Sequence, residues 1–244
     1  AAPPAPPPPI ALLRAWFDAA GFDHGWLELE SRLRAAGGCA TRWRVVQDED
    51  WAHTWRHAFQ RVEIDADHAV APPWLAEEGD LVIDPGMAFG TGEHPTTRAC
   101  LRAVLAHGRP GWRCLDVGSG SGVVALLAAR EGMIAHGIDI EAEAVRAGED
   151  NAARNGLRAT FSQTPLADVP GTWDLVVANI YAEVLVQLMP DLAARVGSKL
   201  VLAGILADRA PLVEEALQAQ GLVIVDRQQD GDWVHLIARR VDAP

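Results

Sequence analysis

The sequence predicts an α/β protein whose doubly wound, mostly parallel sheet ends in an antiparallel hairpin at one edge. From residue 72 onward, short apolar runs alternate with helical segments of roughly 10 to 15 residues. This alternation is typical of parallel strands that helices cover on both faces. Only a short turn, residues 230–232, separates the last two apolar runs, LVIVDRQ and DWVHLIARR, so these two strands must pair antiparallel.

The strands and helices are expected in regular succession. The predicted strands are LVID, RCLDV, AHGIDI, RATFS, WDLVVAN, KLVLAGI and the two runs of the closing hairpin. Helices are predicted from Thr96 to His107, after Gly122, up to Asn155, up to Val196 and from Pro211 to Gln220. Ligands of such open sheets bind outside the carboxyl ends of the strands, so residues at those ends are the candidates for function.

Three segments precede this domain, which we place at residues 63–244. Residues 1–9, AAPPAPPPP, predict an extended proline-rich tail, because each proline fixes φ and removes a backbone donor. Residues 10–47 combine a helical stretch with two strand-like runs, GWLELE and TRWRVV, and predict a small α/β module. Residues 48–62 predict a linker helix.

The predicted linker helix carries Trp51, Trp55 and Phe59 on one face, at i, i+4 and i+8. Packing of this face against a domain is the favoured interpretation, with stacking of a ligand on the rings as the alternative. His53 and His57 have the i, i+4 spacing of a zinc pair. Because no third ligand is evident, we expect these histidines on the surface and predict no metal site.

The composition indicates an ordinary globular protein. With 244 residues, 49% of them hydrophobic, the chain is long enough for one large domain and a small one. Its three cysteines, Cys39, Cys100 and Cys114, are widely spaced, which argues against a disulfide framework or a zinc knuckle and suits a reducing cytoplasm. Neither a membrane-spanning run nor a signal peptide is evident, so we expect a protein that is neither secreted nor membrane-spanning.

The chain has 21 basic and 33 acidic residues, a formal net charge of -12. A field of this sign repels phosphate backbones, so we expect no direct binding of DNA or RNA. A basic protein, in contrast, would be attracted to it. Solubility alone would account for the charge equally well.

The motif LDVGSGSG, residues 115–122, predicts a cofactor site. Alternating glycines, among them Gly118 and Gly120, remove Cβ atoms from the turn between strand and helix, so a ligand can lie against backbone amides. Asp139 closes the next strand, where ribose hydroxyls would arrive. Val123 stands in place of the third glycine of a dinucleotide fingerprint, which favours S-adenosylmethionine over a pyrophosphate cofactor. A turn that uses glycine for purely structural reasons is the alternative.

The closing hairpin favours the same ligand. A mostly parallel sheet with one reversed edge strand is the architecture of methyltransferases, whereas a sheet that binds a nicotinamide cofactor usually stays parallel throughout. The sheet order and the glycine turn therefore indicate a methyl donor independently of each other.

Asn179 is the candidate for orienting a methyl acceptor. An apolar strand, residues 175–178, ends on this asparagine within the motif VVANIYAE. Its side-chain oxygen and the backbone carbonyl of Ile180 can accept two hydrogen bonds from a substrate amine and so aim the nitrogen lone pair at a methyl group. Such positioning supplies much of the catalysis without a protein nucleophile. The alternative role for Asn179 is a cap of the following helix.

The segment DPGMAFGTGEHPTTR, residues 84–98, is too rich in Gly, Pro and Thr for regular structure before its helix begins, and predicts a loop that closes over a ligand. Phe89 is expected to pack on the cofactor, and the threonine pair to cap the helix and donate a hydroxyl. Glu93 and His94 are candidates for steering or deprotonating an incoming ammonium, although such a pair is more often simply solvated.

Six motifs together resemble the PrmA family: DPGMAFGTGEHPTT, LDVGSGSG, GIDI, DNAARNG, VVANIYAE and AGILADRA. The similarity spans residues 49–240 approximately, and the loop ending in HPTT combined with the strand end NIYAE is far more specific than the glycine turn. PrmA enzymes methylate amino groups of the ribosomal large-subunit protein L11.

The resemblance implies a class I fold, S-adenosylmethionine as the donor, and transfer to lysine side-chain and N-terminal amines of a basic ribosomal protein. It implies that the cofactor contacts are Thr97, Gly118, Asp139 and Asn179. Asn179 and the backbone after it would also orient the acceptor. The small module before the linker helix would be a shortened version of the family's substrate-recognition domain.

Three alternatives stay open at this point. The first keeps the chemistry but has another acceptor, a protein or a small-molecule amine. The second is a nicotinamide oxidoreductase, which Val123 and the terminal hairpin disfavour. The third is a non-catalytic assembly factor that uses the fold only to bind a ribosomal protein.

Overall fold

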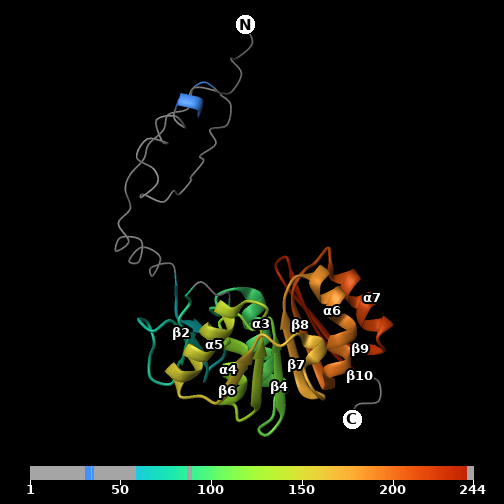
Figure 1. The fold of residues 1–244 in the computed structure, drawn as a ribbon, viewed down its shortest axis with the longest axis horizontal. Helices are drawn as coiled ribbons and strands as arrows, with labels where there is room; N and C mark the ends of the chain where they lie inside the picture. Colours follow the sequence, from blue (N-terminus) through green and yellow to red (C-terminus); the bar gives the residue numbers. More distant parts are fainter. Residues whose placement is uncertain (1–30, 34, 36–58, 87–89, 241–244) are drawn as a thin grey trace. The chain divides into compact units, whose positions relative to one another are not determined.

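A seven-stranded sheet organises the larger part of the protein (Figure 1), with the strand order β6-β5-β4-β7-β8-β10-β9. The strands are β4 (Arg113–Val117), β5 (Ile134–Ile138), β6 (Ala159–Ser162), β7 (Trp173–Asn179), β8 (Val196–Leu206), β9 (Leu222–Asp230) and β10 (Trp233–Arg240). Strands β4 to β8 pair in parallel. The predicted mostly parallel sheet is therefore confirmed.

The computed structural model describes residues 31–33, 35, 59–86 and 90–240, and the chain divides into two units, Ala1–His57 and Ala58–Pro244. In the first unit the four described residues are helical. The proline-rich tail, the two strand-like runs of the predicted module, and most of the predicted linker helix lie outside the described residues.

Four helices connect strands of the sheet, and a fifth precedes its first strand, β4. They are α3 (Pro95–His107), α4 (Val123–Arg130), α5 (Ala142–Asn155), α6 (Ala182–Arg195) and α7 (Ala210–Ala219), and a 3₁₀ turn, η2 (Leu166–Asp168), precedes β7. Local sequence accounts for several ends: Pro95 occupies the first turn of α3, where a missing N–H costs nothing, and Gly156 ends α5 at a φ of 63°. No helix among residues 59–86 and 90–240 is long and apolar enough to cross a membrane.

The helices cover both faces of the sheet, as the alternating residues of β7 demonstrate. Leu175 and Val177 pack into one core cluster together with apolar residues of α3 and α4, whereas Val176 and Ala178 pack into a second cluster with α6 and α7. All four side chains are completely buried. Burial on both faces is why residues 175–178 of this strand are all apolar.

The closing hairpin lies at the edge of the sheet, as predicted, but the reversed strand is not the outermost one. Strand β10 pairs antiparallel with β8 on one side and with β9 on the other. The more apolar strand takes the inner place: Leu236 and Ile237 are buried, whereas Val223 and Val225 of β9 are about half exposed.

A second, three-stranded sheet contains β1 (Val62–Glu63), β2 (Ala69–Ala71) and β3 (Leu81–Val82). The run LVID, expected at the start of the main alternation, supplies β3, which pairs in parallel with β2. The side chain of Asn155 accounts for the separation of β3 from the main sheet. It accepts from the backbone N–H of Val82 and donates to the carbonyl of the same residue. A side chain of α5 thus satisfies the backbone groups of β3 with which another strand would otherwise have paired.

The predicted linker helix, residues 48–62, is wrong at its described end. Residues 59–61 are not helical, and Val62 pairs with Val70 in the small sheet. The ring of Phe59 meets Trp74 edge to face, with 6.2 Å between the ring centroids. Strand pairing to β2 competes successfully with the helical periodicity of this segment.

Candidate functional site

The glycine turn after β4 has the backbone geometry that its sequence predicts. Gly118, Gly120 and Gly122 have φ angles of 73°, 52° and 82°, in the left-handed region that residues with a Cβ rarely adopt. Gly122 is also the N-cap of α4. The backbone N–H of Gly118 donates to the carbonyl of Ile138 at the end of β5, which ties the turn to the neighbouring strand.

Asp139 lies directly against this turn. One carboxylate oxygen accepts from the N–H of Gly120 at 2.9 Å, and the other accepts from the N–H of Glu141 at 3.0 Å. Each oxygen keeps lone-pair capacity for a further donor, because an ionised carboxylate offers about four acceptor sites. The carboxylate is therefore held in place by two backbone N–H groups and keeps acceptor capacity on both oxygens.

Asp116 is a second acid at the turn, to which the sequence analysis gave no role. It is 3% exposed and accepts from the N–H of Ala125 in the first turn of α4, at 3.2 Å. The pKa of Asp116 is raised to about 7, chiefly by burial; the N–H of Ala125 opposes the rise, and the charge of Asp139 adds to it. An acid within an apolar strand just before a glycine turn was the available signal.

Asn179 and Thr97 come together although they lie far apart in the sequence. The Nδ2 of Asn179 donates to Oγ1 of Thr97 at 3.4 Å, and Thr97 is 1% exposed in the first turn of α3. With its nitrogen bound there, the amide presents Oδ1 in another direction. Next along the chain, the side chain of Ile180 lies over the glycine turn: a Cβ on Gly118 would approach its Cγ2 to 2.8 Å.

The loop between β3 and α3 is fixed to the glycine turn by polar contacts. Ser121 donates from its hydroxyl to the carbonyl of Gly90 at 2.6 Å. Asn151 of α5 donates to the carbonyl of Ser121 at 3.0 Å and accepts from the N–H of Asp84 at 2.9 Å. These contacts hold both ends of the loop beside the turn, while Phe89 lies outside the described residues.

The prediction that the threonine pair caps α3 is wrong, because Pro95 occupies the first helical position and the cap falls on His94. The Nδ1 of His94 accepts from the N–H of Thr96 at 3.4 Å and lies 2.7 Å from its hydroxyl. Burial, helped by the charge of Arg98, lowers the pKa of His94.

Glu93, the other member of the proposed acid and imidazole pair, accepts from the N–H of Gln60 at 2.6 Å. His94 in turn meets the ring of Trp233 edge to face, with 4.9 Å between the ring centroids. Both side chains of the pair therefore have structural contacts, and their role toward an incoming ammonium stays a prediction.

Two exposed apolar side chains flank the predicted site, and neither was predicted from the sequence as part of it. Ile140, next to Asp139, is 86% exposed, and Tyr181, next to Ile180, is 74% exposed. Each lies two residues beyond the carboxyl end of a strand, β5 or β7, where ligands of open sheets bind. That position in the sequence was the signal for both.

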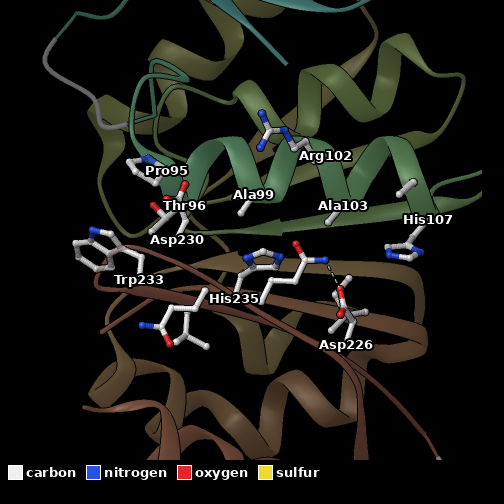
Figure 2. Close-up of a pocket in the computed structure, with 15 residues that line it drawn as sticks. Pro95, Thr96, Ala99, Arg102, Ala103, His107, Asp226, Asp230, Trp233 and His235 are labelled. Atoms are coloured by element: carbon white, nitrogen blue, oxygen red, sulfur yellow. Dashed lines mark hydrogen bonds between the residues drawn. The ribbon is translucent and has the colours of Figure 1, made fainter. Parts of the chain in front are cut away.

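A separate groove of about 300 Å³ lies between α3 and the β9–β10 hairpin (Figure 2). Its lining includes Thr96, His107, Asp226 and His235, and none of the predicted site residues. Among residues 59–86 and 90–240, no three histidine, cysteine, aspartate or glutamate side chains gather as a metal site. Of the predicted residues that the structure describes, Gly118, Gly120, Asp139, Asn179 and Ile180 lie at the carboxyl ends of β4, β5 and β7, and Thr97 of α3 is bound to Asn179.

Comparison with known proteins supports the resemblance to the PrmA family over most of the chain. The family model for ribosomal protein L11 methyltransferase (PrmA) matches residues 12–241. The ribosomal protein L11 methyltransferase of Geobacter sulfurreducens is 43% identical over an alignment that covers 94% of this chain and 82% of the relative. That of Thermus thermophilus is 44% identical, with 80% of this chain and 79% of the relative covered.

Solved structures agree with the fold. The ribosomal protein L11 methylase of Lactobacillus delbrueckii subsp. bulgaricus is 31% identical, with a TM-score of 0.70 over 75% of this chain and 99% of that chain. A magnesium protoporphyrin IX methyltransferase of Synechocystis PCC 6803, 16% identical with a TM-score of 0.52, shares the class I methyltransferase fold alone. The family match and the curated relatives show that this chain belongs to the PrmA family of ribosomal protein L11 methyltransferases.

Proposed function

We propose that this chain transfers methyl groups to lysine side-chain and N-terminal amines of ribosomal protein L11. The observation that carries the proposal is the orientation of Asn179, whose amide nitrogen is bound to Thr97 at the carboxyl end of β7. The carbonyl oxygen of that amide is thereby left to accept from a substrate amine. Family membership supports L11 as the acceptor.

As a member of this family the protein is an S-adenosylmethionine-dependent enzyme, and the residues at the glycine turn fit that cofactor. Asp139 has an acceptor for each ribose hydroxyl, and Gly118 and Gly120 keep side chains away from the turn. Ile140 offers an exposed apolar surface beside Asp139 that suits the adenine ring. When bound, S-adenosylmethionine supplies the methyl group.

Asn179 and Ile180 orient the acceptor in this proposal. The Oδ1 of Asn179 and the backbone carbonyl of Ile180 each accept one N–H of a neutral amine, which leaves the nitrogen lone pair free and fixed in direction. Fixing a nucleophile in an attacking geometry lowers the barrier without any covalent participation of the protein. Ile180 also joins the acceptor side to the cofactor side, since its side chain lies over Gly118.

A cytoplasmic location is part of the proposal. Cys100 and Cys114 are free thiols with no exposed surface, as expected of a protein that needs no oxidising compartment. Burial raises the pKa of both thiols above the ordinary cysteine value, so neither is poised as a reactive thiolate.

The test is a methylation assay with purified ribosomal protein L11 and S-adenosylmethionine, read by intact mass and peptide mapping. We expect mass increments of whole methyl groups on lysine side chains and on the N-terminal amine. The matched control is Asn179→Ala, for which we expect about a hundredfold slower transfer with the fold intact, as thermal unfolding would verify.

Two outcomes would contradict the proposal. Unmodified L11 alongside methylation of another protein or a small amine would move the acceptor elsewhere while keeping the chemistry. Full activity of Asn179→Ala would show that this asparagine has only a structural role at the start of the following helix.

A further inference from the structure

Strand β8 contains a bulge beside the acceptor residues. In the pairing with β10, Leu202 lies opposite Leu236 and Ile205 opposite Val234, so Ala203 and Gly204 together face a single residue of β10. Gly204 has a φ of 80°. Bulges of this kind change the direction of a strand and occur frequently next to active sites.

The bulge brings Gly204 against both proposed acceptor atoms. Asn179 pairs with Ala203 in the β7–β8 ladder, so Gly204 is the residue abreast of Ile180. An ideal Cβ on Gly204 would lie 2.7 Å from the carbonyl oxygen of Ile180 and 3.1 Å from Oδ1 of Asn179. Both distances are shorter than ordinary van der Waals contact, so a side chain at this position would press against both oxygens.

The orientation of Asn179 toward Gly204 has a cause elsewhere in the fold. Because Nδ2 of this amide donates to Thr97, Oδ1 is the atom turned toward β8. The carbonyl of Ile180 reaches the same point from the backbone. Two acceptors, one at the end of β7 and one just after it, thus lie beside a position of β8 that has no side chain.

We propose that Gly204 is a specificity-determining residue of the acceptor site, which rests on the function proposed above. Its hydrogen in place of a side chain keeps the two oxygens open to an incoming primary amine. A methyl group at this position would cover both acceptors or displace the Ile180 peptide. Backbone atoms less than 3.0 Å from a Cβ cannot yield as the end of a flexible side chain can.

The competing explanation is that glycine is needed only for the positive φ of the bulge. Gly231, in the turn between β9 and β10, separates the two explanations. It has a φ of 58°, and a Cβ there would meet nothing within 4 Å. Gly231→Ala therefore places a Cβ at a positive φ without obstructing any acceptor.

The experiment compares Gly204→Ala, Gly231→Ala and the unaltered enzyme for methylation of L11, affinity for S-adenosylmethionine and thermal unfolding. We expect Gly204→Ala to lower kcat/KM for L11 about a hundredfold while the Kd of the cofactor changes less than twofold. Gly231→Ala should match the unaltered enzyme in both. Equal activity of the two variants would overturn the proposal.

A structure of the unaltered enzyme with S-adenosylhomocysteine and a lysine peptide of L11 keeps the proposal testable if Gly204→Ala does not fold. We expect the amine nitrogen in van der Waals contact with the Cα of Gly204, and an amine bound away from it would refute the assignment. Failure of the unaltered enzyme to methylate L11 would instead count against the proposed function, which makes the two failures distinguishable.

Discussion

Asn179 donates from its side-chain amide to the hydroxyl of Thr97, which lies 82 positions earlier in the chain, at 3.4 Å. Thr97 is 1% exposed in the first turn of α3, so its hydroxyl has little freedom to move. The contact decides which end of the amide faces the acceptor side of the site. A residue of α3 thereby controls the orientation of a residue at the end of β7.

Replacing Thr97 by an apolar residue of similar shape should impair orientation more than folding. For Thr97→Val we expect kcat for methylation of L11 to fall about tenfold, because the amide can rotate once its nitrogen loses its partner. Thr97→Ser keeps the hydroxyl and is the control, with activity close to that of the unaltered enzyme. Identical kcat for the two variants would show that the contact does not orient Asn179.

Asp139 should contribute most to cofactor affinity. Asp139→Ala is expected to weaken binding of S-adenosylmethionine by about 1.5 to 3 kcal/mol, the range for hydrogen bonds to a charged group. Since the same carboxylate accepts from Gly120 and Glu141, thermal unfolding without cofactor is needed to measure any loss of the turn itself. Asp139→Asn should be intermediate, and an unchanged Kd from isothermal calorimetry would refute the ribose assignment.

Asp116 should make the stability of the protein depend on pH. Because burial raises its pKa from 3.8 to about 7, the folded chain retains a proton that the unfolded chain has released between about pH 4 and pH 7. This group therefore lowers the free energy of unfolding as the pH rises through that window, and the loss is complete above it.

Urea unfolding at pH 5 and pH 8 tests this consequence. Relative to the unaltered protein, Asp116→Asn should be more stable at pH 8 than at pH 5, because the variant has no carboxyl to ionise. Asp208→Asn, with a side chain that is 75% exposed, is the control and should show no such difference. A difference that is the same at both pH values would argue against a buried protonated carboxyl.

Phe161 packs beneath the glycine turn in a slot formed by three glycines. An ideal Cβ would approach the ring to 2.8 Å from Gly122, 2.5 Å from Gly137 and 2.6 Å from Gly148. For Gly148→Ala, on α5, we expect a destabilisation of about 1 to 3 kcal/mol, because overpacking outweighs the better helix propensity of alanine.

The double variant Gly148→Ala with Phe161→Leu should recover part of the stability that Gly148→Ala loses, since the smaller side chain leaves room for the added methyl group. Urea unfolding of both single variants and the double variant measures this coupling. Strictly additive effects would show that the ring and the glycine do not compete for the same space.

The sequence was sufficient where a feature depends on neighbouring residues. The strand from Trp173 to Asn179 and the helix from Pro95 to His107 were predicted to within about two residues, because apolar periodicity is a local property. The left-handed φ angles of Gly118 and Gly120 were equally accessible, since a tight turn between strand and helix demands them.

Prediction failed where a distant partner decides between local alternatives. The segment at 59–62 has helical periodicity, yet Val62 pairs with Val70 instead. The threonines of HPTT are good capping residues, yet the proline before them moves the cap to His94. The run LVID is a strand, as expected, but Asn155 closes its free edge and keeps it out of the main sheet.

The amino-acid order alone determined the succession of strands and helices, the glycine turn with its acid, and the membership in a family, because each of these is written in contiguous residues. Only the tertiary structure decided that Thr97 binds the amide of Asn179, that Asp116 is buried enough to hold a proton, and that the bulge of β8 brings Gly204 to two acceptor oxygens. These relationships arise when segments far apart in the chain meet across a packed sheet, and no local pattern encodes which atoms then face one another.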